Sequence, residues 1–122
     1  MKHKDFERLV AYEMDALPEA VRRQIANVAI LVAELADDET LDLVGVDDPY
    51  DLLGFYDGVP LTARTTHYGL VPPDTIYLYR QAILAACASD AEVRAQVRAT
   101  LRHELAHYFG IDDDRLHELG AY

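Results

Sequence analysis

The chain has 122 residues, of which 51% are hydrophobic, and it carries a formal net charge of −11 with a sequence pI near 4.6. Nucleic acids and anionic lipid surfaces attract clustered Lys and Arg, so this acidic balance argues against both as partners. No apolar run approaches the roughly 18 residues of a membrane span, and the N-terminal "MKHKDFERLV" lacks the apolar core of a secretory signal. With Cys87 as the single cysteine, the sequence predicts one domain, residues 1–122, in the cytoplasm and without disulfides.

The N-terminal third predicts two helices and a strand. Apolar residues three or four positions apart predict an amphipathic helix over residues 3–17, which Pro18 ends. A second, short helix is expected over residues 18–25, with the proline at its first helical position. The apolar, β-branched run "NVAILVAELA" (residues 27–36) then suits a buried strand, with a longer helix as the alternative.

The middle of the chain predicts a loop and two strands. Residues 36–58 are rich in Asp, Gly and Pro, which indicates a loop with at most one turn of helix. "VPLTAR" (residues 59–64) and "TIYLYRQ" (residues 75–81) are expected to be strands, joined by a turn that contains Gly and Pro. In the second strand Ile76 and Leu78 alternate with two tyrosines, which indicates two different faces.

The clearest helix spans residues 89–110, "SDAEVRAQVRATLRHELAHYFG". Ser89 and Glu92 form a capping box at its start, and Gly110 is a natural C-terminal stop. Apolar residues at every fourth position predict its core stripe: Val93, Val97, Leu101 and Leu105. His103 and His107 project away from that stripe, so they are not part of the main packing face.

Two histidines of this helix predict a metal site. His103 and His107 lie one turn apart on one side of the helix, so two imidazole nitrogens can converge on one Zn²⁺ ion at about 2.0–2.1 Å. Glu104 is rotated off that side and is expected to reach a water on the ion rather than the ion itself. The pattern H-E-x-x-H therefore predicts zinc ligands at His103 and His107 and a general base at Glu104.

A catalytic zinc site needs a third protein ligand and an open position. Gly110 can adopt positive φ and turn the chain back towards the ion, and the register H-E-x-x-H-x-x-G-x-x-D then points to Asp113. Asp112 and Asp114 are near competitors, and His117 is a further one. The alternatives to a catalytic site are a surface helix with two solvated histidines and a structural zinc site, and neither gives Glu104 a role.

Three segments, "HELAHYFGIDDDRL", "LLGFYDGVPLT" and "PPDTIYLYRQAI", resemble the small bacterial zincin-like metallopeptidases, and the resemblance runs from about residue 5 to the end. The extended motif is similar to that of metzincin peptidases, with aspartate in place of the third histidine as in snapalysin-like enzymes. The resemblance implies a minimal α+β zincin-like fold: a small mixed sheet packed on helices, with the active-site helix near the C-terminus. In zincins an edge strand before that helix binds an extended peptide, and residues 75–81 are the candidate here.

The expected function is a zinc-dependent metallopeptidase that acts on a peptide or protein substrate. Zn²⁺ would be held by His103, His107 and Asp113, while Glu104 takes the proton of the attacking water. Tyr108 or Tyr122 could steady the oxyanion, with packing as the alternative for each. The rival function is a non-catalytic, metal-binding module that binds a peptide without cutting it.

Two departures from the larger zincins affect these expectations. The methionine turn of metzincins has no counterpart, because the only methionines are Met1 and Met14, far upstream of the motif. The larger enzymes also carry a C-terminal subdomain as the second wall of the cleft, so this cleft is expected to be shallow or completed by a second copy. A monomer or a small homo-oligomer is therefore expected. Gly54 and Gly58 are expected to serve backbone turns.

Overall fold

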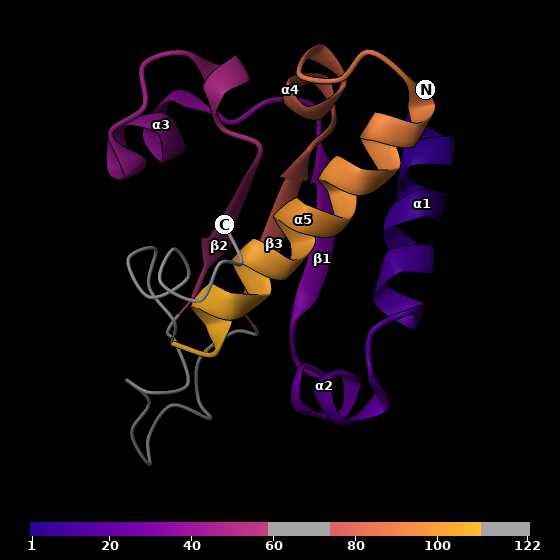
Figure 1. Cartoon of the computed structure of the whole chain (residues 1–122). Helices are drawn as coiled ribbons and strands as arrows, with labels where there is room; N and C mark the ends of the chain where they lie inside the picture. Colours follow the sequence, from indigo (N-terminus) through magenta and orange to yellow (C-terminus); the bar gives the residue numbers. More distant parts are fainter. Residues whose placement is uncertain (59–73, 111–122) are drawn as a thin grey trace, which may run out of the picture.

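A computed structural model describes residues 1–58 and 74–110 of the chain. Figure 1 shows the elements in space, and none of the described helices is both long and apolar enough to cross a bilayer. In chain order the elements are α1 (His3–Asp15), α2 (Glu19–Gln24), β1 (Ala29–Ala33), α3 (Asp38–Val44), the 3₁₀ turn η1 (Pro49–Asp51), β2 (Gly54–Asp57), β3 (Thr75–Tyr79), α4 (Arg80–Ala85) and α5 (Asp90–Tyr108).

The three strands form one small mixed sheet in the order β1-β3-β2. β3 runs parallel to β1, with Ala29 opposite Thr75, and antiparallel to β2, with Gly54 opposite Leu78. The predicted α+β fold with a small mixed sheet is thereby confirmed. The prediction that residues 75–81 form an edge strand is wrong, because β3 is hydrogen-bonded to a neighbour on both sides. That segment also turns into α4 at Arg80, two residues earlier than expected.

Residues 36–58 are more regular than the predicted loop, since they contain α3, η1 and β2. Asp37 caps α3 by accepting a 2.8 Å hydrogen bond from the backbone N–H of Thr40, and Gly45 ends it with a left-handed φ of 76°. The aspartates that suggested a loop thus start short helical segments, which is their usual capping role. At the preceding helix, Pro18 is the N-cap residue of α2, one position before the predicted one.

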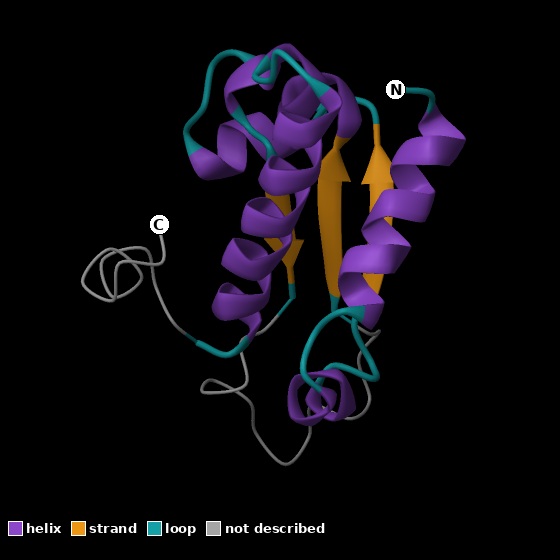
Figure 2. Ribbon diagram, turned by 45° about the vertical axis from the view of Figure 1, so that its right-hand side comes forward, coloured by secondary structure: helices purple, strands orange, loops and turns teal. Residues whose placement is uncertain are grey.

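α1 and α5 lie side by side across one face of the sheet, as Figures 1 and 2 both show. Ile76 and Leu78 of β3 are fully buried beneath them, together with Phe6 of α1. The predicted core stripe of α5 is confirmed, because its four apolar residues are all at most 3% exposed. Cys87 is partly buried and packs against the same core.

The ends of α5 match their sequence signals. The Ser89 hydroxyl accepts a 3.2 Å hydrogen bond from the backbone N–H of Glu92, and the Glu92 carboxylate accepts one of 3.1 Å from the N–H of Ala88. At the other end Gly110 has a φ of 82°, so the predicted positive-φ stop is confirmed. The helix is thus fixed at both ends by local interactions.

Ion pairing adds to the apolar contact between α1 and α5. Glu13 of α1 is only 4% exposed, and its two carboxylate oxygens accept hydrogen bonds of 3.0 and 3.1 Å from the Arg98 guanidinium of α5. A two-pronged bond of this kind fixes the direction of both side chains. It therefore sets the register between the two helices that cover the sheet.

The Leu101→Ala variant is expected to lose about 2–5 kcal/mol of unfolding free energy, because Leu101 is 1% exposed and its removal leaves a cavity under α5. Urea denaturation followed by circular dichroism measures the change. Leu43→Ala is the matched control, since Leu43 is 73% exposed and should change stability by less than about 0.5 kcal/mol. Equal losses in the two variants would contradict the described packing of α5.

Candidate metal centre

α5 brings three potential ligand side chains together near its C-terminal end. One ligand atom from each of His103, Glu104 and His107 lies within 4.8 Å of the other two. The two imidazole rings are 4.7 Å apart between centroids and nearly perpendicular, at 73°. The two imidazoles are thus close enough for one nitrogen of each to reach a single zinc ion, which each would bind at about 2.0–2.1 Å. Two imidazoles are donors that zinc accepts, and the carboxylate beside them is close enough to reach a water on the ion, so the described residues fit such an ion.

The Glu104 carboxylate is buried next to the second histidine. Glu104 is 7% exposed, and its Oε2 lies 3.3 Å from Nδ1 of His107. A carboxylate at this position favours a proton on Nδ1, which leaves the lone pair of Nε2 for a ligand. The sequence predicts that Glu104 is rotated off the ligand side of the helix and reaches a water on the ion rather than the ion itself. Its carboxylate lies within 4.8 Å of a ring nitrogen of each imidazole, which is consistent with that role.

The buried position of Glu104 depends on the close approach of β2 to α5. A Cβ atom on Gly54, the first residue of β2, would lie 2.7 Å from Cγ2 of Thr100 and 3.3 Å from Cγ of Glu104. It would also lie 3.1 Å from the backbone oxygen of Tyr77 in the neighbouring strand β3. Gly54 therefore serves helix–strand packing, and the expectation of a turn there is wrong. Gly58 lies in a bend after β2.

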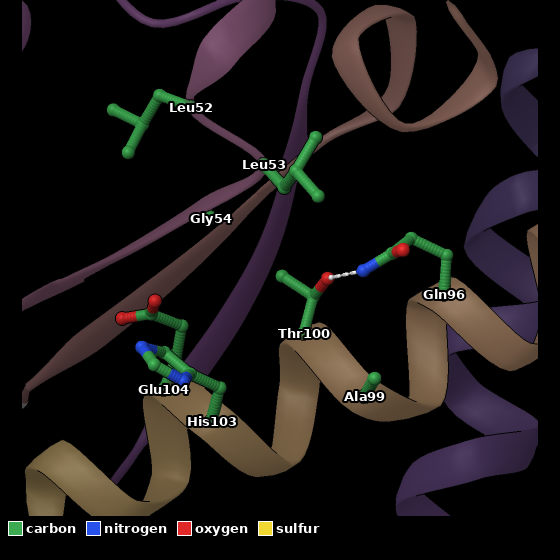
Figure 3. A pocket seen from close by; sticks show the side chains of 8 residues that line it. All are labelled: Leu52, Leu53, Gly54, Gln96, Ala99, Thr100, His103 and Glu104. Carbon is green, nitrogen blue, oxygen red and sulfur yellow. Dashed lines mark hydrogen bonds between the residues drawn. The ribbon is translucent and has the colours of Figure 1, made fainter. Parts of the chain in front are cut away.

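A cleft of about 260 Å³ opens beside this contact, between α5 and the segment that leads into β2. Figure 3 shows the His103 and Glu104 side chains on the side of α5 that faces Leu52–Gly54. The amide of Gln96 donates a 3.0 Å hydrogen bond to the Thr100 hydroxyl further along the helix. The cleft is lined mainly by apolar groups of Leu52, Leu53, Gly54, Gln96, Ala99, Thr100, His103 and Glu104.

The apolar part of this cleft was not predicted from the sequence. Leu52 and Leu53 belong to a stretch that composition marks as a loop, and they line the site only because β2 pairs with β3. The one available signal was Gly54 itself. A glycine inside a strand often marks a place where another element approaches closely.

The tyrosines near the site are packing residues. Tyr108 is 3% exposed, its hydroxyl donates a 3.1 Å hydrogen bond to the backbone oxygen of Gln24, and its ring meets Tyr56 edge-on at 6.1 Å. This supports the packing alternative for Tyr108. Tyr77 and Tyr79 belong to the other face of the sheet, away from α5.

Several predicted residues lie outside the described part of the chain. These are the third-ligand candidate Asp113, its competitors Asp112, Asp114 and His117, the oxyanion candidate Tyr122, and the predicted strand 59–64. The positive φ of Gly110 is the last described feature on the path to them. The site as described thus consists of the His103, Glu104 and His107 cluster and the cleft beside it.

Comparison with known proteins identifies a family and a related fold. Residues 25–121 match the family model described as zincin-like metallopeptidase. The structure is also similar to that of a conserved hypothetical protein from Thermo thermophilus, with 24% sequence identity and a TM-score of 0.57, over 89% of this chain and 94% of that one. This likeness supports the fold alone. The search of curated proteins gives no significant match.

The Gly54→Ala variant is expected to lose about 1–3 kcal/mol of unfolding free energy, because the new methyl group would overlap Thr100 and press on Glu104. Thermal or urea unfolding measures the loss. The double variant Gly54→Ala with Thr100→Ser removes the methyl group of the tightest contact and should recover part of it. If the single variant is as stable as the wild type, β2 and α5 are not in the described contact.

Proposed function

Because the chain belongs to the zincin-like metallopeptidase family, we propose that it is a zinc-dependent peptidase that hydrolyses peptide bonds. The observation that carries the proposal is the buried Glu104 carboxylate beside two histidines that can share one ion. A solvated surface helix would leave this carboxylate in water. A purely structural zinc site would not require a carboxylate that faces a cleft.

The zinc ion is proposed to be held by His103 and His107 from α5 and by Asp113 after the Gly110 turn. Asp112, Asp114 and His117 are the alternative third ligands. Three protein ligands leave one position of a tetrahedral ion open, as catalytic sites require. The bound ion would supply an acidified water and polarise the substrate carbonyl.

Glu104 is proposed as the general base and then the general acid. Its carboxylate accepts a proton from the attacking water and later delivers this proton to the nitrogen of the departing amine. His107 Nδ1 at 3.3 Å and the packing against Gly54 hold the carboxylate in place during both transfers. Proton transfer by a positioned group typically contributes about 10²- to 10⁴-fold to the rate.

The proposed substrate is an extended peptide or protein segment that adds to β2. β2 is an edge strand among the described residues, and it lies directly beside the helix that carries the three site residues. An extended peptide can hydrogen-bond to such an edge and continue the sheet. β2 thus takes the role that the sequence had suggested for residues 75–81.

Purified wild-type protein is expected to contain close to one zinc ion per chain, and His103→Ala should lose it, because one of the ligands is removed. Elemental analysis of both proteins measures this. His3→Ala is the matched control, since His3 lies at the start of α1, away from the cluster on α5, and its loss should leave the metal content unchanged. The third ligand is identified by comparing the zinc content of four variants: Asp113→Ala, Asp112→Ala, Asp114→Ala and His117→Ala. Full retention of zinc in His103→Ala would contradict the proposed site.

Glu104→Gln is expected to retain zinc and to lose about 10²- to 10⁴-fold of the peptidase rate, because the amide cannot accept the proton. Cleavage of a mixed peptide library is measured by mass spectrometry, with zinc and with a chelator. Glu7→Gln, an exposed residue of α1, is the control for the loss of one charge. Equal cleavage by wild type and Glu104→Gln would rule out the base role. Absence of cleavage by both would favour the peptide-binding module.

A further inference from the structure

The face of the sheet opposite α5 carries a groove of about 350 Å³ that the peptidase proposal does not use. It lies between α3 and the sheet, and all three strands contribute to its floor. Two kinds of side chain in its lining can bind a ligand. These are the aromatic rings of Phe55, Tyr77 and Tyr79, and the carboxylates of Asp37, Glu39 and Asp57. None of the described residues that line the groove is Lys or Arg.

The floor of the groove contains two half-buried aromatic rings, Phe55 and Tyr77, with the buried ring of Tyr79 beside them. The rings of Tyr77 and Tyr79 are nearly parallel, at 3°, with centroids 6.3 Å apart, and Phe55 is paired with Tyr77 across the strands. Tyr79 is 3% exposed, and burial, followed by the nearby Asp37 carboxylate, raises its pKa to about 12. Tyr79 therefore adds no negative charge at physiological pH, and the half-buried rings of Phe55 and Tyr77 are the ones that a ligand in the groove can contact. Arg and Lys side chains bind such rings through cation–π contacts.

The carboxylates lie around this floor on two different elements. Asp37 and Glu39 come from the start of α3, and Asp57 comes from the end of β2. Hydrogen bonds from the side chain and the backbone N–H of Thr40 lower the pKa of Asp37, so this carboxylate is ionised at neutral pH. A groove with this lining and no basic group among its described residues is complementary in charge to a cationic side chain.

Successive residues of β2 belong to opposite faces of the sheet. This connects the groove to the edge where the substrate is proposed to bind. Gly54 borders the cleft beside Glu104, whereas Phe55 and Asp57 line the groove on the opposite face. Residues of a strand that adds to β2 share the face of the residue directly opposite, and their Cβ atoms lie about 4.5–5.5 Å away. Successive side chains of the peptide therefore point in turn to α5 and to the groove.

We propose that the groove binds an arginine or lysine side chain of the peptide that lies along β2. The substrates are then extended segments with an arginine or lysine whose side chain enters the groove. The next residue of the segment points its side chain to α5. This inference rests on the proposed function only for the placement of the peptide on β2. It assigns substrate preference to Asp57 and Phe55, which are remote from the bond-breaking groups because they belong to the other face of the sheet.

Binding is tested without turnover, by using the zinc-loaded full chain with Glu104→Gln. The probe is a fluorescein-labelled, end-blocked heptapeptide in which arginine alternates with leucine, compared with the same peptide carrying norleucine for arginine. Fluorescence anisotropy measures both dissociation constants. The arginine peptide is expected to bind about fivefold or more tightly, because one of its alternating arginines enters an aromatic, acidic site.

Second substitutions, each added to the Glu104→Gln chain, show which residues bind the arginine side chain. Asp57→Asn should remove most of the preference for arginine, and Phe55→Leu should reduce it while an apolar side chain is kept. Asp15→Asn removes the same charge from the exposed end of α1, the helix that covers the opposite face, and should leave the preference intact. Circular dichroism confirms that each variant is folded. Should Asp57→Asn unfold the chain, Phe55→Leu still decides the outcome.

Two results would overturn the groove assignment: equal binding of the two peptides, or an equal loss of binding in Asp57→Asn and Asp15→Asn, which indicates general charge attraction. Failure of the proposed function looks different. If the wild type cleaves the mixed library but shows no preference for arginine, the peptidase stands and the groove assignment is wrong. If arginine binding depends on Asp57 but no peptide is cleaved, the groove stands and the peptidase proposal is wrong.

Discussion

The contact between Gly54 and α5 is the constraint on which the rest of the site depends. With no side chain at Gly54, β2 lies so close to the helix that a Cβ atom there would be 2.7 Å from Cγ2 of Thr100 and 3.3 Å from Cγ of Glu104. This contact buries Glu104 next to His107 and places Leu52 and Leu53 opposite the helix as the wall of a cleft. A larger residue would separate helix and strand, and the carboxylate would then face water. The burial of Glu104 beside the two histidines therefore depends on a residue that lies outside the helical motif.

The helical part of the site could be predicted because its signals are local. Three signals act within one helix: the Ser89 capping box, the apolar residue at every fourth position, and Gly110. The structure has each of them. The spacing of His103 and His107 places both on one side of any α-helix, whatever packs around it. Even the two faces of β3 followed from the alternation of its residues, with Ile76 buried against the helices. Periodicity within a single element was enough for these conclusions.

The strand order could not be predicted in this way. β2 has four residues, two of which are Gly and Asp, so composition suggested a loop, and only its pairing with β3 makes it a strand. The resemblance predicts an edge strand at residues 75–81, whereas β3 is the central strand of the described sheet and β2 lies at its edge. The cleft and the groove combine residues from elements far apart in the chain. Such sites follow from long-range pairing, which no local pattern encodes.

Burial of Glu104 also links the fold to the ion that the site is proposed to hold. A carboxylate that is 7% exposed is costly to bury as an anion unless a positive charge lies close by. Two kinds of positive charge could meet this need at His107: a proton on the imidazole, or a cation shared by both histidines. These two compete, because a metal ion needs the imidazole lone pair that a proton would occupy. A divalent cation brings two positive charges where a proton brings one, so the cation is the more effective partner. The packing that buries Glu104 against Gly54 thus creates a negative site that favours binding of a metal, and the fold and the proposed chemistry depend on the same contact.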